Sequence, residues 1–338
     1  MPKFQPMKPV VSVVLPFYNS ESTLGQSIES ILKQELDNFE LILIDNNSTD
    51  DSYEIAGKYA EEDSRILLIS EPEQGIVHAL NTGLGNSMAK YIARMDADDI
   101  SHPERLKLQY EFLEKKPDFG LVACRVNYVH DESLQYGFYE YVRWNNDIIS
   151  YQDICTNRFV ESPLIHPSVM FRKELIDLYG NYKQGDFPED YELWLRWLEK
   201  GIKMEKLPEK LLDWRDSKER LSRTDDRYST TSFFETKTVY LYNWLKENNP
   251  FHPKVVVWGA GRIARQRFAL LHDLGVHPKF LIDLRANPTR NVIEYTRTPS
   301  AGKHFIVNYV GNRDARNKIR EFLFDLDYVE GKDFICVA

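Results

Sequence analysis

Tyr91-Ile92-Ala93-Arg94-Met95-Asp96-Ala97-Asp98-Asp99 joins an apolar run to three carboxylates, and the organisation of the chain follows from it. In an extended segment, side chains two residues apart point to the same face, so Asp96 and Asp98 present their carboxylates together. Two hard oxygen ligands on one face suit Mg²⁺ or Mn²⁺, which also bind phosphate oxygens. The alternative is an acidic turn before a helix, because Ser101-x-x-Glu104 has the form of a capping box with Pro103 in its first turn. Taken alone, the stretch leaves both interpretations open.

The composition is that of a globular protein of 338 residues, long enough for about two domains. A net charge of −9 disfavours a nucleic acid or an anionic membrane as the main partner. The three cysteines are far apart in the sequence, so we expect neither a disulfide framework nor a zinc site. Residues 1–9 are too polar for a signal peptide, and no apolar run approaches the ~20 residues of a membrane span. A cytoplasmic location is therefore expected.

Strands and helices alternate through the first hundred residues. Runs of buried-strand character occupy residues 10–15, 41–44, 66–69 and 90–95, and amphipathic helical patterns lie between them. This alternation predicts a parallel sheet, in which ligands bind beyond the carboxyl ends of the strands. Asp45 ends the second run, and Asp96 and Asp98 follow the fourth. We therefore expect these acids to line one pocket, which favours the metal interpretation over the acidic turn.

Three motifs occur in series along this part of the chain: Pro16-x-Tyr18-Asn19, Asp45-x-Asn47-Ser48-Thr49-Asp50 and Asp96-Ala97-Asp98-Asp99. In order and spacing they resemble the signature series of family 2 glycosyltransferases with the GT-A fold. The resemblance implies a nucleotide-sugar site, with Pro16, Tyr18 and Asp45 near the nucleobase and ribose and with Asn19 in the same site. It also implies that Asp96, Ala97 and Asp98 lie at the diphosphate, where Asp98 and Asp96 would be the metal ligands.

The same resemblance implies a catalytic base. Phe187-Pro188-Glu189-Asp190 opens an aromatic-rich helix, where a simple helix cap is the alternative, because the helix dipole favours a carboxylate there. The matching family position is a Glu-Asp pair whose Asp is the general base, which implies Asp190 as base and Glu189 as a neighbour that contacts the acceptor. His166 is expected to contact the acceptor or the donor phosphates, and a structural role is its alternative. The resemblance further implies that a strand at 211–215 leads to a flexible loop over the diphosphate, and a solvated charged loop is the alternative. The candidate phosphate partners are Arg215, Lys218, Arg220 and Arg223.

The C-terminal part begins with another buried-strand run at 254–258, followed by Gly259-Ala260-Gly261-Arg262-Ile263-Ala264. A strand, a G-x-G-x-x-A turn, a helix and a second strand that ends at Asp283 form a dinucleotide-binding pattern. Gly259, Gly261 and Asp283 are therefore candidates for a second nucleotide site. The alternative is that the glycines serve only a tight turn and close helix packing. The remaining length suffices for one mononucleotide-binding half and not for a complete dehydrogenase.

The expected fold is α/β in two parts: a GT-A nucleotide-sugar-binding domain with a Rossmann-like mixed sheet at 1–228, a connecting helix and linker at 229–252, and a small α/β Rossmann-like domain at 253–338. This layout resembles a subset of family 2 proteins that includes N-acetylglucosaminyltransferase-like proteins. The resemblance implies an inverting, metal-dependent enzyme of polysaccharide biosynthesis that uses Mn²⁺ or Mg²⁺ and needs no NAD for catalysis. It would move a sugar from UDP-GlcNAc or a UDP-hexose to a glycan or glycolipid hydroxyl.

Two other functions stay open at this stage. One is a nucleotide-binding oxidoreductase built on the Gly259–Ala264 turn, and the other is a regulatory protein whose transferase site has decayed. No nucleic-acid partner is expected, and self-association is left open. A glycolipid acceptor would bring the chain to a membrane surface as a peripheral protein.

Overall fold

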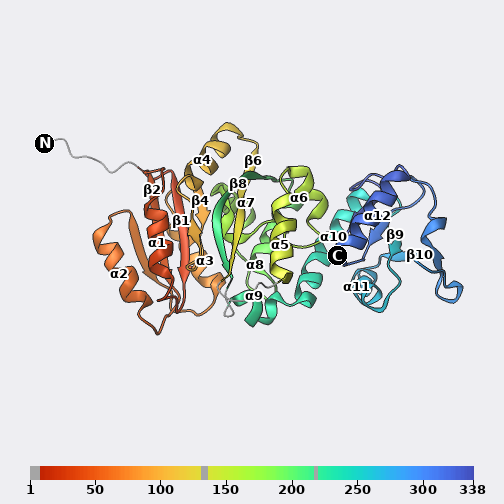
Figure 1. The fold of residues 1–338 in the computed structure, drawn as a ribbon, viewed down its shortest axis with the longest axis horizontal. Helices are drawn as coiled ribbons and strands as arrows, with labels where there is room; N and C mark the ends of the chain where they lie inside the picture. The colour runs from red at the N-terminus through yellow and green to blue at the C-terminus, as the bar shows by residue number, and fades with distance from the viewer. Residues whose placement is uncertain (1–7, 131–135, 217–219) are drawn as a thin grey trace. The chain divides into compact units, whose positions relative to one another are not determined.

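The computed structural model describes residues 8–130, 136–216 and 220–338, which fall into two compact units (Figure 1). The second unit draws on three parts of the chain, residues 152–163, 186–199 and 225–338, and the first unit comprises the others. Two short segments from the middle of the sequence thus belong to the second unit. The domain boundaries expected at 228 and 252 stay a prediction.

The first unit is built on an eight-stranded sheet with strand order β3-β2-β1-β4-β7-β6-β8-β5. The strands are β1 (Val11–Phe17), β2 (Phe39–Asp45), β3 (Ile66–Ser70), β4 (Tyr91–Arg94), β5 (Ile100–Ser101), β6 (Phe119–His130), β7 (Met170–Arg172) and β8 (Lys203–Asp216). The helices are α1 (Leu24–Leu32), α2 (Ser52–Glu62), α3 (Ile76–Asn86), α4 (Arg105–Lys115), α5 (Tyr136–Asp147), α7 (Glu174–Tyr179) and the short α9 (Leu221–Thr224), with a 3₁₀ turn at His166–Ser168. The first four strands run parallel, and β7 pairs antiparallel with β4 and β6, so the expected mixed sheet is confirmed.

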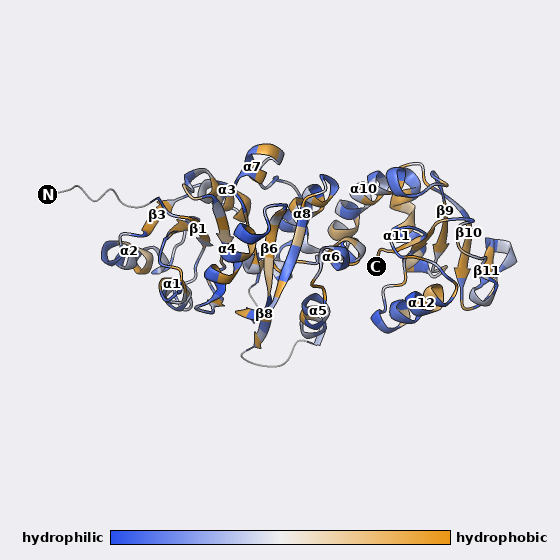
Figure 2. Ribbon diagram, turned by 90° about the horizontal axis from the view of Figure 1, so that it is seen from above, coloured by the Kyte–Doolittle hydropathy of each residue, from blue (hydrophilic) through white to orange (hydrophobic). Residues whose placement is uncertain are grey.

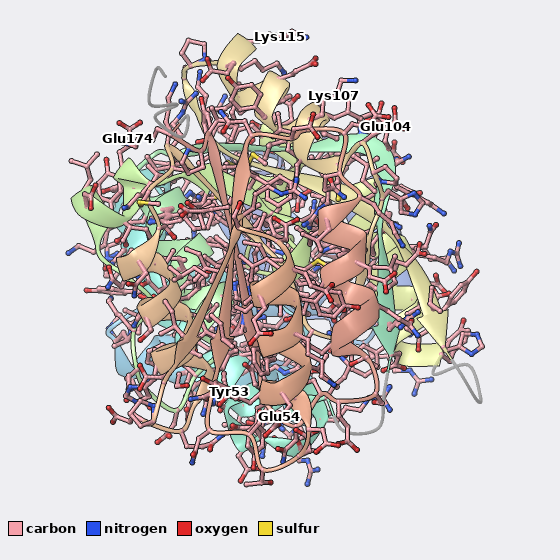
Figure 3. The ribbon with its side chains drawn as sticks, turned by 90° about the vertical axis from the view of Figure 1, so that its left-hand side faces the viewer. Tyr53, Glu54, Glu104, Lys107, Lys115 and Glu174 are labelled. Carbon is pink, nitrogen blue, oxygen red and sulfur yellow. The ribbon has the colours of Figure 1, made fainter. Side chains whose placement is uncertain are left out.

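The core of the first unit forms where helices cover both faces of the parallel strands. Every residue of β1 and β2 is buried, as expected for strands enclosed on both sides. The neighbouring helices direct only one face inward, and α1 buries Leu24, Ile28 and Ile31. Charged residues occupy the outer faces, as Figure 3 shows for Lys107 and Lys115 of α4. The alternation of buried strands and amphipathic helices is thus the source of this layer arrangement.

The segment before α4 differs from the capping-box expectation. Helix α4 begins at Arg105, and Glu104 occupies the N-cap position without a side-chain hydrogen bond. Ser101 lies in β5, where it pairs with Leu212 of β8, and its hydroxyl accepts a hydrogen bond from Gln34 Nε2 at 3.0 Å. The capping-box interpretation of Ser101 and Glu104 is therefore wrong, because pairing with β8 recruits Ser101 into the sheet.

The second unit contains a five-stranded sheet, β11-β10-β9-β12-β13, in which every neighbouring pair is parallel. The strands are β9 (Lys254–Trp258), β10 (His277–Asp283), β11 (Val292–Glu294), β12 (Ile306–Asn308) and β13 (Phe334–Cys336). The helices are α6 (Tyr151–Asn157), α8 (Glu189–Glu199), α10 (Thr230–Asn248), α11 (Arg262–Asp273) and α12 (Arg313–Asp325), with 3₁₀ turns at Asp226–Tyr228, Pro288–Arg290 and Tyr295–Arg297. In Figure 2 the strands β9 and β10 are apolar, whereas α12 is largely hydrophilic. The predicted Rossmann-like sheet is therefore present. Among the described helices of both units, none is both long and apolar enough to cross a membrane.

Candidate active site

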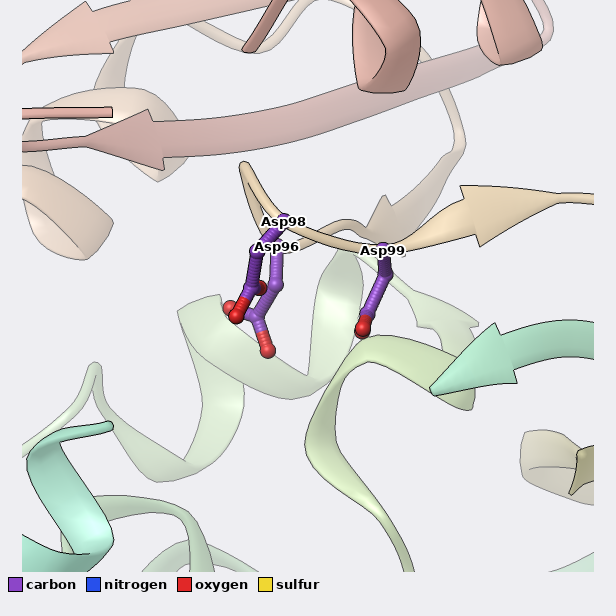
Figure 4. Close-up of side chains that lie close together, drawn as sticks. All are labelled: Asp96, Asp98 and Asp99. Atoms are coloured by element: carbon purple, nitrogen blue, oxygen red, sulfur yellow. The ribbon is translucent and has the colours of Figure 1, made fainter. Parts of the chain in front are cut away.

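Three aspartates meet directly after β4. One carboxylate oxygen each of Asp96, Asp98 and Asp99 lies within 4.8 Å of the others. Figure 4 shows the side chains of Asp96 and Asp98 next to each other, but the chain turns at Ala97 and Asp98, so a turn and not an extended segment brings them together. Because β4 lies beside β1, which lies beside β2, and all three are parallel, the cluster is at the same sheet edge as Asp45. The acidic stretch therefore forms a compact group of oxygen ligands at the expected edge.

The electrostatics of this cluster favour a bound cation. Burial, and then the charge of Asp96, raise the pKa of the Asp98 carboxyl above its ordinary value. Burial, followed by the charges of Asp98 and Asp96, raises the pKa of Asp99 well above its ordinary value. Asp96 has a partner of its own, since Arg94 Nη2 lies 2.6 Å from its Oδ1. Holding three carboxylates this close costs free energy, and a divalent cation offsets that cost.

Asp99 connects the acidic segment to two other elements. Its backbone carbonyl accepts a hydrogen bond from the Ser27 hydroxyl of α1 at 2.7 Å, and its Oδ1 accepts one from the Arg215 N–H of β8 at 2.9 Å. The second carboxylate oxygen is buried and has no hydrogen-bond partner among the described residues. A buried carboxylate oxygen without a partner is costly, and it fits a site that receives a cation.

The loops after β1 and β2 are joined by side-chain to backbone hydrogen bonds. Asn19 has a left-handed backbone, and its Oδ1 accepts from Thr49 N at 2.8 Å. Asp45, which is almost fully buried, accepts from Ser48 N at 3.2 Å. Tyr18, in the loop after β1, is 49% exposed. Pro16 and Ala97, in contrast, are covered side chains that shape the strand ends.

The arginines after β8 have separate partners. Arg215 donates to Gln26 Oε1 at 2.8 Å, and Arg223 forms an ion pair with Asp216 at 2.6 Å. The positive charge of Arg220 partly opposes the rise in the pKa of both Asp98 and Asp99, and Arg94 does the same for Asp98. Its guanidinium lies 4.0 Å from the centroid of the Trp214 ring. Lys218 lies outside the described residues. The role of these arginines as phosphate partners stays a prediction.

A fully buried arginine that the sequence reasoning missed holds two site segments together. Arg105 Nη1 donates to the carbonyl of Arg94 at 3.1 Å and to that of Pro167 at 2.5 Å. Arg94 is two residues before Asp96, and Pro167 directly follows His166. An arginine near the start of an amphipathic helix is usually a surface residue, so its sequence position alone gave no signal of this role.

His166 is held by Tyr182, whose hydroxyl lies 2.7 Å from the His166 Nε2. Burial, and then the positive charge of Arg94, lower the pKa of His166 well below 6.5. The imidazole is therefore neutral in the folded chain at neutral pH, which suits hydrogen bonding more than charge pairing with phosphate. Its contact with acceptor or donor stays a prediction.

This shift predicts a pH dependence of stability. The unfolded chain protonates His166 near its ordinary pKa of 6.5, whereas the folded chain binds that proton only at lower pH. The stabilisation is therefore complete above pH 6.5 and is lost as the pH falls toward the folded pKa. We expect the free energy of unfolding of the wild type to fall more steeply on acidification than that of His166→Asn, measured by urea denaturation at a series of pH values. His102→Asn, at a 40% exposed imidazole, controls for the loss of a ring. Parallel pH profiles for wild type and His166→Asn would contradict this assignment.

The expected base lies in the second unit, at the start of α8. Asp190 Oδ1 accepts from the Tyr191 N–H at 2.7 Å. Glu189 is buried, and its Oε2 accepts a hydrogen bond from the Tyr228 hydroxyl at 2.7 Å. Burial and the charges of Glu189 and Asp190 raise the pKa of Tyr228, which keeps its hydroxyl a donor. Glu189 is thus fixed by a specific partner, and the roles of both acids in catalysis stay predictions.

Comparisons with known proteins find similarity to glycosyltransferases. The family model of glycosyl transferase family 2 matches residues 12–180. The chain is 36% identical over 228 residues to the putative glycosyltransferase EpsE of Bacillus subtilis, which covers 65% of this chain and 78% of EpsE. It is 29% identical to the O-antigen biosynthesis glycosyltransferase WbnJ of Escherichia coli, with coverage of 70% and 90%. The structure of S. aureus TarS 1-349 in complex with UDP-GlcNAc matches with a TM-score of 0.54 at 16% identity, over 78% of this chain and 70% of that one. TarS shares the fold, and the matched family segment contains the whole aspartate cluster.

Proposed function

The chain belongs to glycosyltransferase family 2 and has the GT-A fold, and from this we propose that it transfers a sugar from a UDP-sugar to a glycan or glycolipid hydroxyl, with inversion and with a divalent cation. The observation that carries the proposal is the cluster of Asp96, Asp98 and Asp99 at the carboxyl edge of the parallel strands. The donor class rests on the two-part layout, which resembles that of N-acetylglucosaminyltransferase-like proteins. UDP-GlcNAc or a UDP-hexose is the donor we propose, and TarS in complex with UDP-GlcNAc illustrates a protein of this fold with such a ligand.

The donor would bind along the edge formed by β2, β1 and β4. The exposed ring of Tyr18 offers a stacking face for the uracil, and the carboxylate of Asp45 can accept from a ribose hydroxyl. Asp98 and Asp96 would hold Mn²⁺ or Mg²⁺, and the partnerless oxygen of Asp99 fits the same ion. When bound, the cation stabilises the negative charge that develops on a diphosphate leaving group.

The protein's own residues account for the remaining steps. The Arg220 guanidinium, whose charge already acts on Asp98 and Asp99, would donate to the diphosphate. Asp190 would accept the proton of the acceptor hydroxyl while that oxygen bonds to the anomeric carbon and the electron pair of the old glycosidic bond leaves with UDP. Glu189, held by Tyr228, would orient the acceptor beside this base. This division of labour separates donor binding from proton transfer.

The test is a panel of nucleotide sugars incubated with and without Mn²⁺, with release of the free nucleoside diphosphate as the readout. We expect turnover of at least one UDP-sugar, even if only by slow transfer to water, and we expect EDTA to remove it. The full chain is assayed, because the expected base lies in the second unit. Failure to turn over or bind any UDP-sugar would overturn the proposal, and turnover that EDTA leaves unchanged would overturn its metal dependence.

A further inference from the structure

The two glycines of the Gly259–Ala264 turn differ in what the fold requires of them. Gly259 has a φ of +108°, and a Cβ there would lie 3.1 Å from the Cβ of Ala264, so the turn and the helix packing explain this glycine. Gly261 has a φ of −64°, which any residue adopts, and a Cβ added there would meet no atom within 4 Å. It is the N-cap of α11 and makes no side-chain capping bond. The fold therefore gives no steric reason for a glycine at 261, whereas a ligand that lies against the backbone would give one.

A cavity of about 440 Å³ opens beside this turn. Its lining includes Ala260, Asp283, Arg285, Asn287 and Arg290, which come from the turn and from the segment after β10. The volume is within the range of about 300–1,000 Å³ that small-molecule sites occupy. Arg285 and Arg290 are exposed, and within the described residues neither guanidinium forms a hydrogen bond or an ion pair. The cavity thus has two available cationic groups that suit a phosphorylated ligand.

Asp283 is fixed at the wall of this cavity. Its Oδ2 accepts from the Ala260 N–H and its Oδ1 from the Leu284 N–H, both at 2.7 Å. An ionised carboxylate can accept about four hydrogen bonds, so each oxygen keeps a lone pair for a ligand hydroxyl. Its position at the end of β10, in the strand next to the glycine turn, is that of the acid which binds ribose hydroxyls in nucleotide-binding sheets.

The sheet places these groups where such a ligand binds. Numbered along the chain, its strands have the spatial order 3-2-1-4-5, and the order reverses between β9 and β12. Ligands of open parallel sheets bind beyond the carboxyl ends of the strands next to this reversal. The turn after β9 and Asp283 at the end of β10 both lie at that edge.

We propose that the second unit carries a nucleotide site of its own, which takes a nucleoside diphosphate with an unmodified ribose diol and needs no metal ion. The diol binds to Asp283, the base lies in the cavity beside Arg285, and the diphosphate lies against Gly261 within reach of Arg290. This site is separate from the transferase site and does not depend on the function proposed for it.

Isothermal titration calorimetry of the full chain in EDTA tests the proposal, with ADP, UDP, their 2′-deoxy forms and ADP-ribose as probes. We expect one of the diphosphates to bind at a single site, and its 2′-deoxy form to bind at least tenfold more weakly. ADP and UDP distinguish a site for adenine nucleotides from one that binds the nucleotide released by the transferase reaction. No binding of any probe at millimolar concentration would overturn the proposal.

Variants locate the site. Gly261→Val should weaken binding at least tenfold while the chain stays folded, because the Cβ that it adds meets no protein atom within 4 Å. Gly57→Val, at another glycine with no atom near its Cβ, is the control. Arg285→Gln combined with Arg290→Gln should weaken binding similarly, whereas Arg297→Gln, an exposed arginine outside the cavity lining, should not. Asp98→Asn should leave binding in EDTA unchanged. Binding that persists in the Gly261 and arginine variants, or that is lost in Asp98→Asn, would overturn the assignment.

Discussion

Asp98→Asn is expected to abolish the metal-dependent binding of a UDP-sugar and to lower the rate of transfer by about a thousandfold or more. The amide keeps the shape of the side chain but removes a negative charge from the centre of the aspartate cluster. Stabilisation of a diphosphate leaving group by a bound cation contributes several kcal/mol, and each 1.36 kcal/mol corresponds to about tenfold in rate. The measurement is nucleoside diphosphate release with Mn²⁺, together with binding of UDP with and without Mn²⁺.

In the absence of metal, the Asp98→Asn variant should be at least as stable as the wild type, although it loses activity. Because the pKa of Asp98 is raised in the folded chain, its ionised form destabilises the fold as the pH rises through that pKa. Asparagine removes this penalty, so at neutral pH in EDTA the melting temperature of Asp98→Asn should equal or exceed that of the wild type. In the presence of UDP, added Mn²⁺ should raise the melting temperature of the wild type further but should not raise that of the variant.

A matched control distinguishes this effect from a general loss of charge. Asp118→Asn makes the same change at an exposed aspartate that pairs with Lys203. It should keep both the thermal shift and the activity of the wild type. An Asp98→Asn protein that retained the full Mn²⁺-dependent shift would show that Asp98 is not a ligand of the cation.

The parts of the fold that could be predicted from the sequence are those set by local pattern. The apolar runs of β1 and β2 and the helical spacing of α1 are enough to indicate parallel strands with covering helices. The grouping of Asp96 and Asp98 is also expected from the sequence, although a turn at Ala97 and Asp98, and not strand alternation, produces it. These features depend on neighbours in sequence, so one sequence suffices to identify them.

Features set by distant contacts could not be predicted. Ser101 has the local signal of a helix cap, but pairing with Leu212 of β8 places it in a strand. The role of Arg105 depends on the carbonyl of Pro167, which is 62 positions away. Likewise, the local composition of residues 186–199 does not indicate that they belong to the second unit. In each case a partner far along the chain outweighs a local preference.

Asp190→Asn is expected to lower transfer by roughly 10²–10⁴-fold, the usual contribution of a positioned general base, while binding of the UDP-sugar with Mn²⁺ stays at the wild-type level. The reason is that proton acceptance belongs to the acceptor step, whereas the residues proposed to bind the donor belong to the other unit. Asp186→Asn, at an exposed aspartate four positions earlier, should retain full activity. Tyr228→Phe should give a smaller loss than Asp190→Asn, because it removes only the hydroxyl that holds Glu189.

The pair Asp98→Asn and Asp190→Asn then separates two functions that a single activity assay would confuse. Asp98→Asn should lose donor binding and transfer, whereas Asp190→Asn should lose only transfer. If both variants lost donor affinity equally, Asp190 would be part of the donor site, and the base would have to be sought elsewhere.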